Sequence, residues 1–507
     1  MKKLALLLTI LIIASFLRLY NLTDLPPGLY PDEAMNGNNA LEARATGHWK
    51  VFYPENNGRE GLFINIQGLF LAVLGNQPWA LRLPSAIFGI LTVLGIYFLT
   101  KELFQEWPKK DLGFKMSRAE KLALLAAFFI AVSFWHINFS RIGFRAIMAP
   151  LLLTWGIYLL IRAFRKPHWF APIIAGFIYG LGLHTYIAYR ATPLLIVICF
   201  WLMVRKYGWE PVLRIGFIFT VIAFLTFLPL GLYFWENPAE FFGRTTQVSV
   251  FNSPAPLKNL GENILKTAGM FNFSGDWNWR HNIAGRPLLF WPVGILFLVS
   301  IFYGVYLVFR GFIISNLRSL ISKQIPNPDN NNRQNFIILL AWLVIAGLPV
   351  IVSNEGLPHA LRAILMAPPV FIIAAFGGIS AYEFLKQHWS RSSSVIGCLF
   401  VAVLVVESFY SYFITWGKNP NVQGAFSADY IQIGRTLNSL PKELPKYVVI
   451  QAGGGLVRGI PMPSQTVMFI TDSFTSEKQK TKNITYLLPG QENQIPANEK
   501  NYIAYIK

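Results

Sequence analysis

The sequence predicts an all-α polytopic membrane protein that ends in a small soluble α/β domain. Of the 507 residues, 54% are hydrophobic and only 14% are charged, whereas a soluble protein carries about 25% charged residues. The apolar residues are concentrated in runs of about 20, the length that spans a bilayer. These runs stop near residue 415, and short β-like stretches separated by Gly and Pro turns follow.

Eleven apolar segments are interpreted as membrane spans, and a pattern of up to thirteen transmembrane helices is compatible with the sequence. The segments are 3–20, 79–100, 120–138, 146–164, 169–187, 191–204, 213–234, 287–309, 335–353, 363–384 and 394–415. The first follows Lys2 and Lys3 as in a signal peptide, but without a convincing cleavage site, so we expect an uncleaved span. Both cysteines lie within apolar runs, which excludes a disulfide framework.

The net charge of +19 is concentrated in short loops between spans, which points to membrane topology and not to nucleic acid as a partner. If the N-terminus is cytoplasmic, every second loop is basic, as the positive-inside rule requires. The residues are Lys101, Lys109, Lys110, Lys115, Arg118, Lys121, Arg162, Arg165, Lys166, Arg205, Lys206, Arg214, Arg310, Arg318, Lys323, Arg333, Lys386 and Arg391. An odd number of spans then places the C-terminus outside the cytoplasm. We expect the membrane to be the plasma (inner) membrane.

Two domains are expected, a transmembrane module over 1–415 and an extracytoplasmic domain over 416–507. The second should contain one helix, Ala428–Ser439. Its β-like stretches are Tyr447–Gln451, Thr466–Ile470, Thr485–Leu488 and Tyr502–Ile506. In the first module, the cytoplasmic loop Pro326–Asn335 is Asn-rich and is expected to be flexible.

The first outer loop, 21–78, contains two adjacent acids, Asp32 and Glu33, in a turn punctuated by Pro and Gly. The spacing of apolar residues predicts two interfacial helices after this turn, over Glu33–Gly47 and Gly61–Leu74. An acidic turn held at the membrane face suits a substrate that is a lipid-linked phosphate ester. The spacing equally allows a simpler role, in which the two acids cap the helix that they open.

Basic and aromatic residues recur where later spans meet the outer loops. They are Arg141 and Arg145, then His184, Tyr186, Tyr189 and Arg190, and then Glu355, His359 and Arg362. Arginine suits bidentate contacts with phosphate, although each could instead extend to lipid headgroups. The convergence of three such segments on one face favours a phosphate-binding pocket.

No cofactor or metal is required by the pattern. The seven histidines lack metal-ligand spacing, and only a divalent metal at Asp32 is left open. The sequence has no Walker loop, no Gly-rich dinucleotide turn and no nucleophile elbow, so chemistry driven by ATP or NAD is unsupported.

Three segments carry a family resemblance: Tyr30-Pro31-Asp32-Glu33-Ala34, Gly61-Leu62-Phe63-Ile64-Asn65, and Arg82-Leu83-Pro84-Ser85-Ala86-Ile87-Phe88-Gly89. They resemble the N-terminal third of the dolichyl-phosphate-mannose–protein mannosyltransferase superfamily, which includes the bacterial lipid A aminoarabinose transferases. The resemblance covers roughly 1–165 and implies a GT-C fold with a catalytic outer loop. Two departures stand out. Arg59-Glu60-Gly61 replaces a Lys-Pro-Pro segment, and Phe144–Pro150 lacks the acid found in many relatives.

The resemblance implies an inverting glycosyltransferase for cell envelope glycan or lipopolysaccharide biosynthesis. The donor would be a polyprenyl-phosphate-linked sugar, the acceptor a lipid, a glycan or a protein, and the active site extracytoplasmic. Asp32 is the first candidate for the general base and Glu33 the second. Candidates for the donor phosphate are Arg59, Arg141, Arg362 and His359, and those for the rest of the substrate pocket are Tyr30, Glu60, His184, Tyr186 and Arg190.

Two other functions would explain parts of the sequence. A transporter or flippase of a lipid-linked substrate would keep ionisable residues near the midplane and show repeats. Apart from Glu120 and Glu383 at span ends, the spans lack acids except Glu407, and no repeat is visible. A scaffold that binds partners through the C-terminal part would leave the Asp-Glu turn unexplained.

Overall fold

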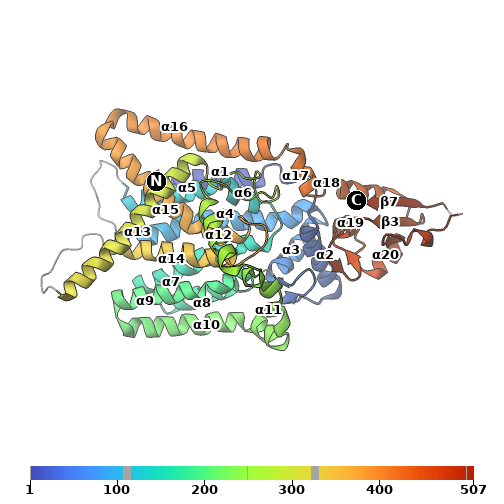
Figure 1. Cartoon of the computed structure of the whole chain (residues 1–507), viewed down its shortest axis with the longest axis horizontal. Helices are drawn as coiled ribbons and strands as arrows, with labels where there is room; N and C mark the ends of the chain where they lie inside the picture. Colours follow the sequence, from blue (N-terminus) through green and yellow to red (C-terminus); the bar gives the residue numbers. More distant parts are fainter. Residues whose placement is uncertain (1, 107–115, 248, 321–329, 498–499) are drawn as a thin grey trace.

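The computed structural model describes residues 2–106, 116–247, 249–320, 330–497 and 500–507. The molecule is elongated: a bundle of long helices fills one side, and a small part with strands projects from one end (Figure 1). We call this end of the bundle the cavity end. The N-terminus lies toward the opposite end, far from the C-terminus (Figure 1).

The bundle consists of helices that match the eleven predicted spans one for one. They are α1 (Lys2–Leu19), α4 (Pro78–Phe104), α5 (Arg118–Ala131), α7 (Met148–Arg165), α8 (Phe170–Gly182), α9 (Pro193–Tyr207), α10 (Trp209–Glu236), α13 (Trp291–Leu320), α14 (Asn330–Ile351), α15 (Ala367–His388) and α16 (Ser390–Phe409). Within the described ranges, eight helices are long and apolar enough to cross a membrane. The three below that limit are α1, α5 and α8, of which α5 has only 14 residues and α8 only 13.

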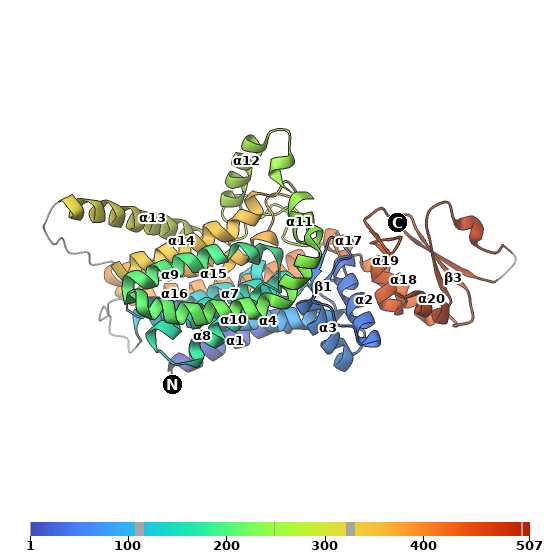
Figure 2. The same ribbon diagram turned by 90° about the horizontal axis from the view of Figure 1, so that it is seen from below.

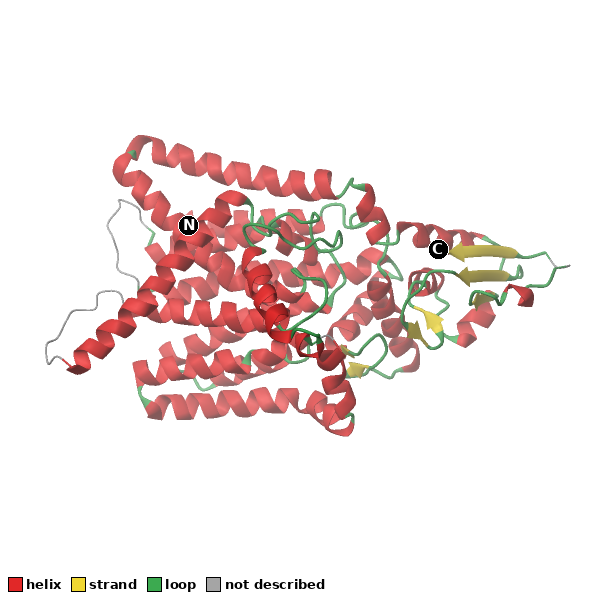
Figure 3. Ribbon diagram, in the orientation of Figure 1, coloured by secondary structure: helices red, strands yellow, loops and turns green. Residues whose placement is uncertain are grey.

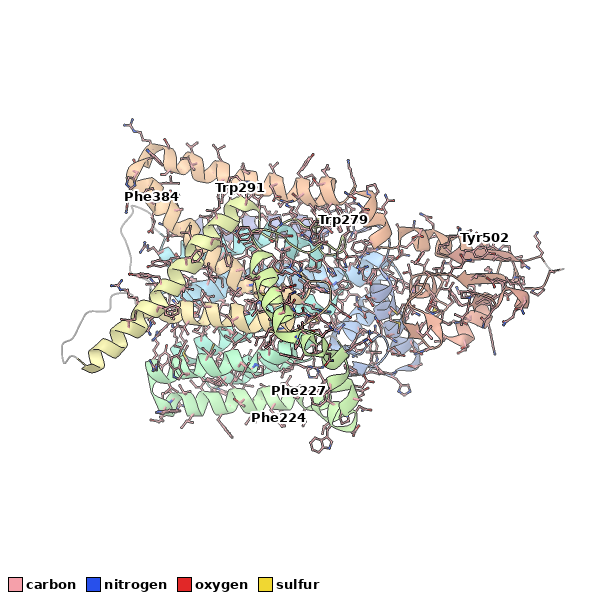
Figure 4. All side chains as sticks on the ribbon, viewed as in Figure 1. Phe224, Phe227, Trp279, Trp291, Phe384 and Tyr502 are labelled. Atoms are coloured by element: carbon pink, nitrogen blue, oxygen red, sulfur yellow. The ribbon has the colours of Figure 1, made fainter. Side chains whose placement is uncertain are left out.

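The bundle has an apolar exterior, as expected of a surface that faces lipid. Phe224, Trp291 and Phe384 are exposed there by 58%, 68% and 56% (Figure 4). Large side chains of this kind cannot be left in water over so many helices at low cost. The chain is therefore an integral membrane protein, and the prediction of an all-α polytopic fold is confirmed.

Shorter elements gather at the cavity end. They are α2 (Pro31–Thr46), β1 (Phe52–Tyr53), β2 (Arg59–Glu60), α3 (Gly61–Leu74), α6 (Phe134–Phe139), η1 (Arg145–Ile147), η2 (Ile187–Ala191), α11 (Pro238–Gln247), η3 (Val250–Asn252), α12 (Pro256–Gly269), η4 (Arg362–Met366), the π-helical turn η5 (Tyr410–Trp416) and α17 (Pro420–Ala425). Helices α2 and α3 are the two helices predicted after the acidic turn. Figure 2 shows them between the bundle and the C-terminal part.

The C-terminal part carries strands, drawn in yellow in Figure 3. It contains a three-stranded parallel sheet with the order β6-β3-β7. Its elements are α18 (Ala428–Ser439), β3 (Lys446–Ile450), β4 (Leu456–Val457), β5 (Ile460–Pro461), α19 (Ser464–Thr471), α20 (Ser476–Lys482), β6 (Ile484–Leu487), η6 (Glu492–Gln494) and β7 (Tyr502–Ile506). The predicted helix and three of the four predicted strands are present. The predicted boundary at 415 falls within η5.

The prediction of a strand at Thr466–Ile470 is wrong, because this segment belongs to helix α19. Its consecutive buried residues Val467, Met468 and Phe469 contact both the C-terminal core and α2. A short, fully buried apolar run does not distinguish a helix from a strand by its periodicity.

Helix α19 also fixes the C-terminal part on the first outer loop. The Thr466 hydroxyl donates to the Leu29 carbonyl at 2.8 Å, and the Asn38 amide donates to the Gln465 side chain at 2.9 Å.

Some predictions concern residues outside the described ranges. Lys109, Lys110, Lys115 and Lys323 lie there, as do residues 326–329 of the loop expected to be flexible. The rest of that loop, 330–335, is helical and begins α14.

Candidate active site

A cavity of about 510 Å³ lies where the first outer loop, the loops at the cavity end and the C-terminal part meet. Its charged or titratable lining residues, apart from tyrosines, are Asp32, Arg59, Arg145, His359 and Arg362. The C-terminal part contributes Tyr430 and the loop Gly453–Gly455. Three arginines against one carboxylate make the cavity electropositive, which suits an anionic ligand.

Asp32 is the one carboxylate among the described residues that line this cavity. It stands at the second position of α2, behind Pro31, whose fixed φ favours the first turn of a helix. One carboxylate oxygen accepts a hydrogen bond from the Asn56 amide, and the side chain is only partly buried. The remaining oxygen lone pairs are therefore available to a proton from a bound hydroxyl group.

Glu33, its neighbour, is fully buried and lies outside the cavity lining. Its carboxylate accepts from Arg82 Nε at 2.9 Å and from the backbone N–H of Gly143 at 2.7 Å. It also accepts from the backbone N–H of Tyr30 at 3.3 Å, which is a helix-capping contact of the kind that the sequence allows. Of the two adjacent acids, Glu33 caps and Asp32 faces the cavity.

Arg59 lines the cavity although its side chain is almost entirely buried. It donates to the side-chain oxygens of Asn36 at 2.7 Å and Asn39 at 2.5 Å. Burial lowers the pKa of Arg59 to about 10, with a further contribution from Arg145, so it stays charged at neutral pH. Among the described residues, its hydrogen bonds are with these two amides and with the Glu55 backbone carbonyl, all of which are neutral.

Glu60 organises two further arginines without lining the cavity. Its carboxylate accepts from Arg145 Nε at 2.8 Å and lies 3.4 Å from Arg190 Nη2. Burial alone would raise the pKa of Glu60, but Arg145 and Arg190 hold it below the usual value. Arg145 stacks over Tyr186, with its guanidinium carbon 5.7 Å from the ring centroid, and both residues line the cavity.

His359, from the loop between α14 and η4, and Arg362, the first residue of η4, both line the cavity. The Arg362 guanidinium donates to the Ser353 hydroxyl and to the Glu355 carboxylate, the latter at 3.2 Å. Since the Glu355 side chain is 59% exposed, an incoming anion could displace it.

Arg141 and His184, both predicted site residues, lie outside the cavity lining. Arg141 is fully buried and donates to the carbonyls of Leu17, Asn21 and Leu25 at 2.9–3.2 Å. It therefore holds the start of the first outer loop. The His184 ring nitrogen Nε2 lies 2.9 Å from the Thr226 carbonyl oxygen, so this histidine joins α8 to α10.

Tyr30 lines the cavity as predicted, and its ring lies under the Arg280 guanidinium at 4.0 Å. Burial, assisted by Asp32, raises the pKa of Tyr30 to about 12. The sequence-based site omitted Arg145, Asn56 and Tyr430. Arg145 belongs to the same basic segment as Arg141, whereas no spacing in the sequence connects Asn56 or Tyr430 with Asp32.

A second cavity of about 400 Å³ adjoins the first, and the two share Tyr186 and Arg362. Its lining is mainly apolar and includes Phe241, Leu348 and Val352, with Arg190 at the polar side. Arg190, which was expected in the first cavity, does not line it. Its guanidinium carbon lies between the rings of Phe234 and Phe241, 4.8 and 4.6 Å from their centroids.

Among the described residues, a single group of three possible metal ligands comes together, Asp276, His281 and His359. Asp32 is not part of it.

Comparisons with known proteins agree with this architecture. The sequence model of the family described as dolichyl-phosphate-mannose-protein mannosyltransferase matches residues 62–110, which contain most of α3 and all of α4. No curated protein matches the sequence.

Solved structures match over most of the chain. The oligosaccharyltransferase of Archaeoglobus fulgidus tethered with an acceptor peptide has a TM-score of 0.55 and 13% identity, covering 92% of this chain and 63% of that one. ArnT from Cupriavidus metallidurans bound to undecaprenyl phosphate has a TM-score of 0.51 and 13% identity, covering 95% and 89%. Its apo state has a TM-score of 0.54 and 12% identity, covering 99% and 89%. The chain thus spans less than two thirds of the oligosaccharyltransferase chain.

These matches show that the chain has the GT-C fold of membrane glycosyltransferases, as the resemblance in its first third implied. The sequence match to the mannosyltransferase family is confined to the segment 62–110.

Proposed function

We propose that the protein transfers a sugar from a polyprenyl-phosphate-linked donor to a hydroxyl group of a lipid, glycan or protein acceptor. The observation that carries this proposal is the cavity in which Asp32 is the one lining carboxylate and Arg59, Arg145 and Arg362 supply positive charge. A glycosyl transfer of this kind needs one proton acceptor and a counter-charge for the phosphate that leaves.

The donor fits the two adjoining cavities. The sugar and the phosphate would occupy the electropositive cavity, and the first isoprene units would enter the apolar one past Tyr186 and Arg362. Arg362 borders both cavities, so it is the best-situated arginine for a phosphate at their junction. The ArnT structure with undecaprenyl phosphate is a precedent for such a ligand in this fold.

In the proposed reaction, the acceptor oxygen attacks the anomeric carbon as Asp32 takes its proton. The bond from that carbon to the phosphate oxygen breaks with its electron pair, so the lipid phosphate leaves and the configuration is inverted. General-base assistance is worth about 10²–10⁴-fold in rate. Arginines fixed before the reaction stabilise the charge that develops on the leaving phosphate.

The acceptor would approach from the side of the C-terminal part, where Tyr430 and the loop Gly453–Gly455 line the cavity. We propose that this side is extracytoplasmic and that the protein resides in the plasma (inner) membrane. The alternation of basic loops in the sequence supports this orientation.

The test uses full-length protein in liposomes with a panel of labelled polyprenyl-phosphate sugars and membrane extracts as acceptors. Transfer of label to an acceptor by the wild type and its loss in Asp32→Asn are expected. Movement of the labelled donor between leaflets without any transfer would support the flippase alternative and overturn the proposal.

A further inference from the structure

We propose that Asp276, His281 and His359 form a binding site for a divalent metal ion of the zinc class, distinct from Asp32. The three residues offer one carboxylate oxygen and two imidazole nitrogens, and these ligand atoms all lie within 4.8 Å of one another. Imidazole and carboxylate together suit zinc and its neighbours among the divalent transition metals.

The two distances from Asp276 to the imidazoles are close to those of a metal site. Asp276 Oδ2 lies 2.9 Å from His281 Nδ1 and 3.9 Å from His359 Nδ1. In a tetrahedral site with bonds of about 2.0–2.1 Å, ligand atoms are about 3.3 Å apart. Shifts of about half an ångström in each direction would therefore bring both pairs to ligand spacing.

Charge supports a cation at this place. Asp276 is 3% exposed and His281 is 5% exposed, so the carboxylate is shielded from water. A buried carboxylate needs a compensating charge or a full set of hydrogen bonds. Across the described ranges, its ion-pair contacts are with the two imidazoles alone, and a metal ion held by all three groups would supply a positive charge beside the carboxylate.

The surroundings hold the carboxylate in a fixed orientation. Asp276 Oδ1 accepts from the backbone N–H of Asn278, and Oδ2 accepts from that of Ala360, both at 2.8 Å. Contacts of this kind around a ligand orient it and support metal affinity. Metal binding would replace the hydrogen bond between Asp276 and His281 and the long 3.4 Å contact from the Arg362 backbone N–H to His359 Nδ1.

The ion would join two loops that are distant in sequence. Asp276 and His281 precede α13, whereas His359 belongs to the loop between α14 and η4 that carries Arg362 into the cavity. A metal here would fix that loop, so His359 acts as a metal ligand and a positioning residue for Arg362. It would not be the phosphate ligand predicted from the sequence.

Metal content measures the site directly. Full-length protein is stripped with EDTA, reloaded with Zn²⁺ or Co²⁺, desalted and analysed for bound metal. We expect about one ion per wild-type chain, at least a tenfold loss of affinity in His281→Gln and His359→Gln, and the visible absorption of four-coordinate Co²⁺ in the wild type. His184→Gln is the matched control, because this buried histidine at the same end bonds the Thr226 carbonyl and should leave metal content unchanged.

A second readout is the melting temperature of the stripped protein, which Zn²⁺ should raise for the wild type and for His184→Gln but not for His281→Gln. Equal metal content in wild type and His281→Gln, with no stabilisation by Zn²⁺, would overturn the proposal and leave Asp276 as a hydrogen-bonded loop anchor. Neither readout depends on sugar transfer, so the result is independent of the proposed glycosyltransferase activity.

Discussion

Glu33 and Arg82 form a buried ion pair at the base of the first outer loop, with Arg82 Nε 2.9 Å from Glu33 Oε1 and both side chains at most 1% exposed. The Arg82 guanidinium also donates to the carbonyls of Pro26 at 2.6 Å and Gly28 at 2.9 Å. The pair thus connects the start of α2, the turn before it and α4. Because Asp32 directly precedes Glu33, the ion pair between Glu33 and Arg82 also holds Asp32 in its position beside the cavity.

Glu33→Gln should therefore lower stability more than any exposed acid would. Removing one partner of a buried pair leaves an uncompensated charge and typically costs about 3–5 kcal/mol. The measurement is the melting temperature of the purified protein in detergent. Glu42→Gln is the control, since Glu42 pairs with Arg458 at a partly exposed site, where such pairs contribute about 0–1 kcal/mol. Equal melting temperatures for the two variants would contradict the anchoring role.

Asp32→Asn should abolish transfer while the protein inserts and melts as the wild type does. The side chain is partly exposed and its hydrogen bonds are with the side chains of Asn56 and Tyr30 at the cavity, so it contributes little to packing. Loss of the general base is expected to reduce turnover by about 10²–10⁴-fold.

The measurement for Asp32→Asn is single-turnover transfer from a labelled donor, with Asp24→Asn as the control. Asp24 is an exposed acid of the same loop that bonds Thr23 at 2.8 Å. Undiminished turnover in Asp32→Asn would remove Asp32 from the reaction and leave it as a residue of the first turn of α2.

Sequence alone predicted the parts of the fold that depend on local pattern. The apolar runs located each bundle helix, and the turn residues located α18 and three strands, because burial in lipid or in a sheet leaves a periodic trace. Helix α19 was not predicted as a helix, because its buried residues are contiguous and show no helical period. The π-helical turn η5 and the docking of α19 on α2 depend on contacts between segments hundreds of residues apart, and these leave no local pattern.

The candidate site was predictable to a smaller extent. Tyr30, Asp32, Arg59, Tyr186, His359 and Arg362 line the cavity, as expected from their place beside outer loops. Glu33, Arg141 and His184 stood beside the same loops, but their side chains bond the protein itself. Spacing shows which charged residues are near a membrane face, whereas only tertiary contacts decide which of them are already paired.

Topology is tested with a reporter that is active only outside the cytoplasm. Fusion after Lys507 should give an active reporter, and fusion at Asn330 should give an inactive one. The two positions lie toward opposite ends of the molecule, since the C-terminal part projects beyond the cavity end and α14 begins away from it (Figure 1). Activity at Asn330 with none at Lys507 would invert the orientation and place Asp32 on the cytoplasmic side.

Arg141→Lys should affect stability, whereas Arg59→Lys should affect the dependence of transfer on donor concentration. The Arg141 guanidinium donates to three backbone carbonyls at the start of the first loop. A lysine cannot make all three contacts in the same geometry, so Arg141→Lys should lower the melting temperature. Arg59 lines the cavity, so Arg59→Lys should raise the donor concentration needed for half-maximal transfer. The reverse assignment, with Arg141→Lys changing only the donor dependence, would return Arg141 to the phosphate site.

Arg362→Lys tests whether Arg362 binds the donor phosphate or only contacts lipid headgroups. The substitution keeps the charge but loses the planar fork that matches two phosphate oxygens. A hydrogen bond to a charged group is worth about 1.5–3 kcal/mol, so turnover at subsaturating donor should fall by about 10–100-fold, and Arg362→Ala should fall further.

The matched control for Arg362→Lys is Arg214→Lys, on the exposed surface of α10. A lysine extends to headgroups as an arginine does, so this change should be silent. Melting temperatures of both variants should stay near that of the wild type, since the Glu355 partner of Arg362 is mostly exposed. Wild-type turnover and donor dependence in Arg362→Lys would remove Arg362 from the phosphate site and leave Arg59 and Arg145 as the candidates that line the cavity.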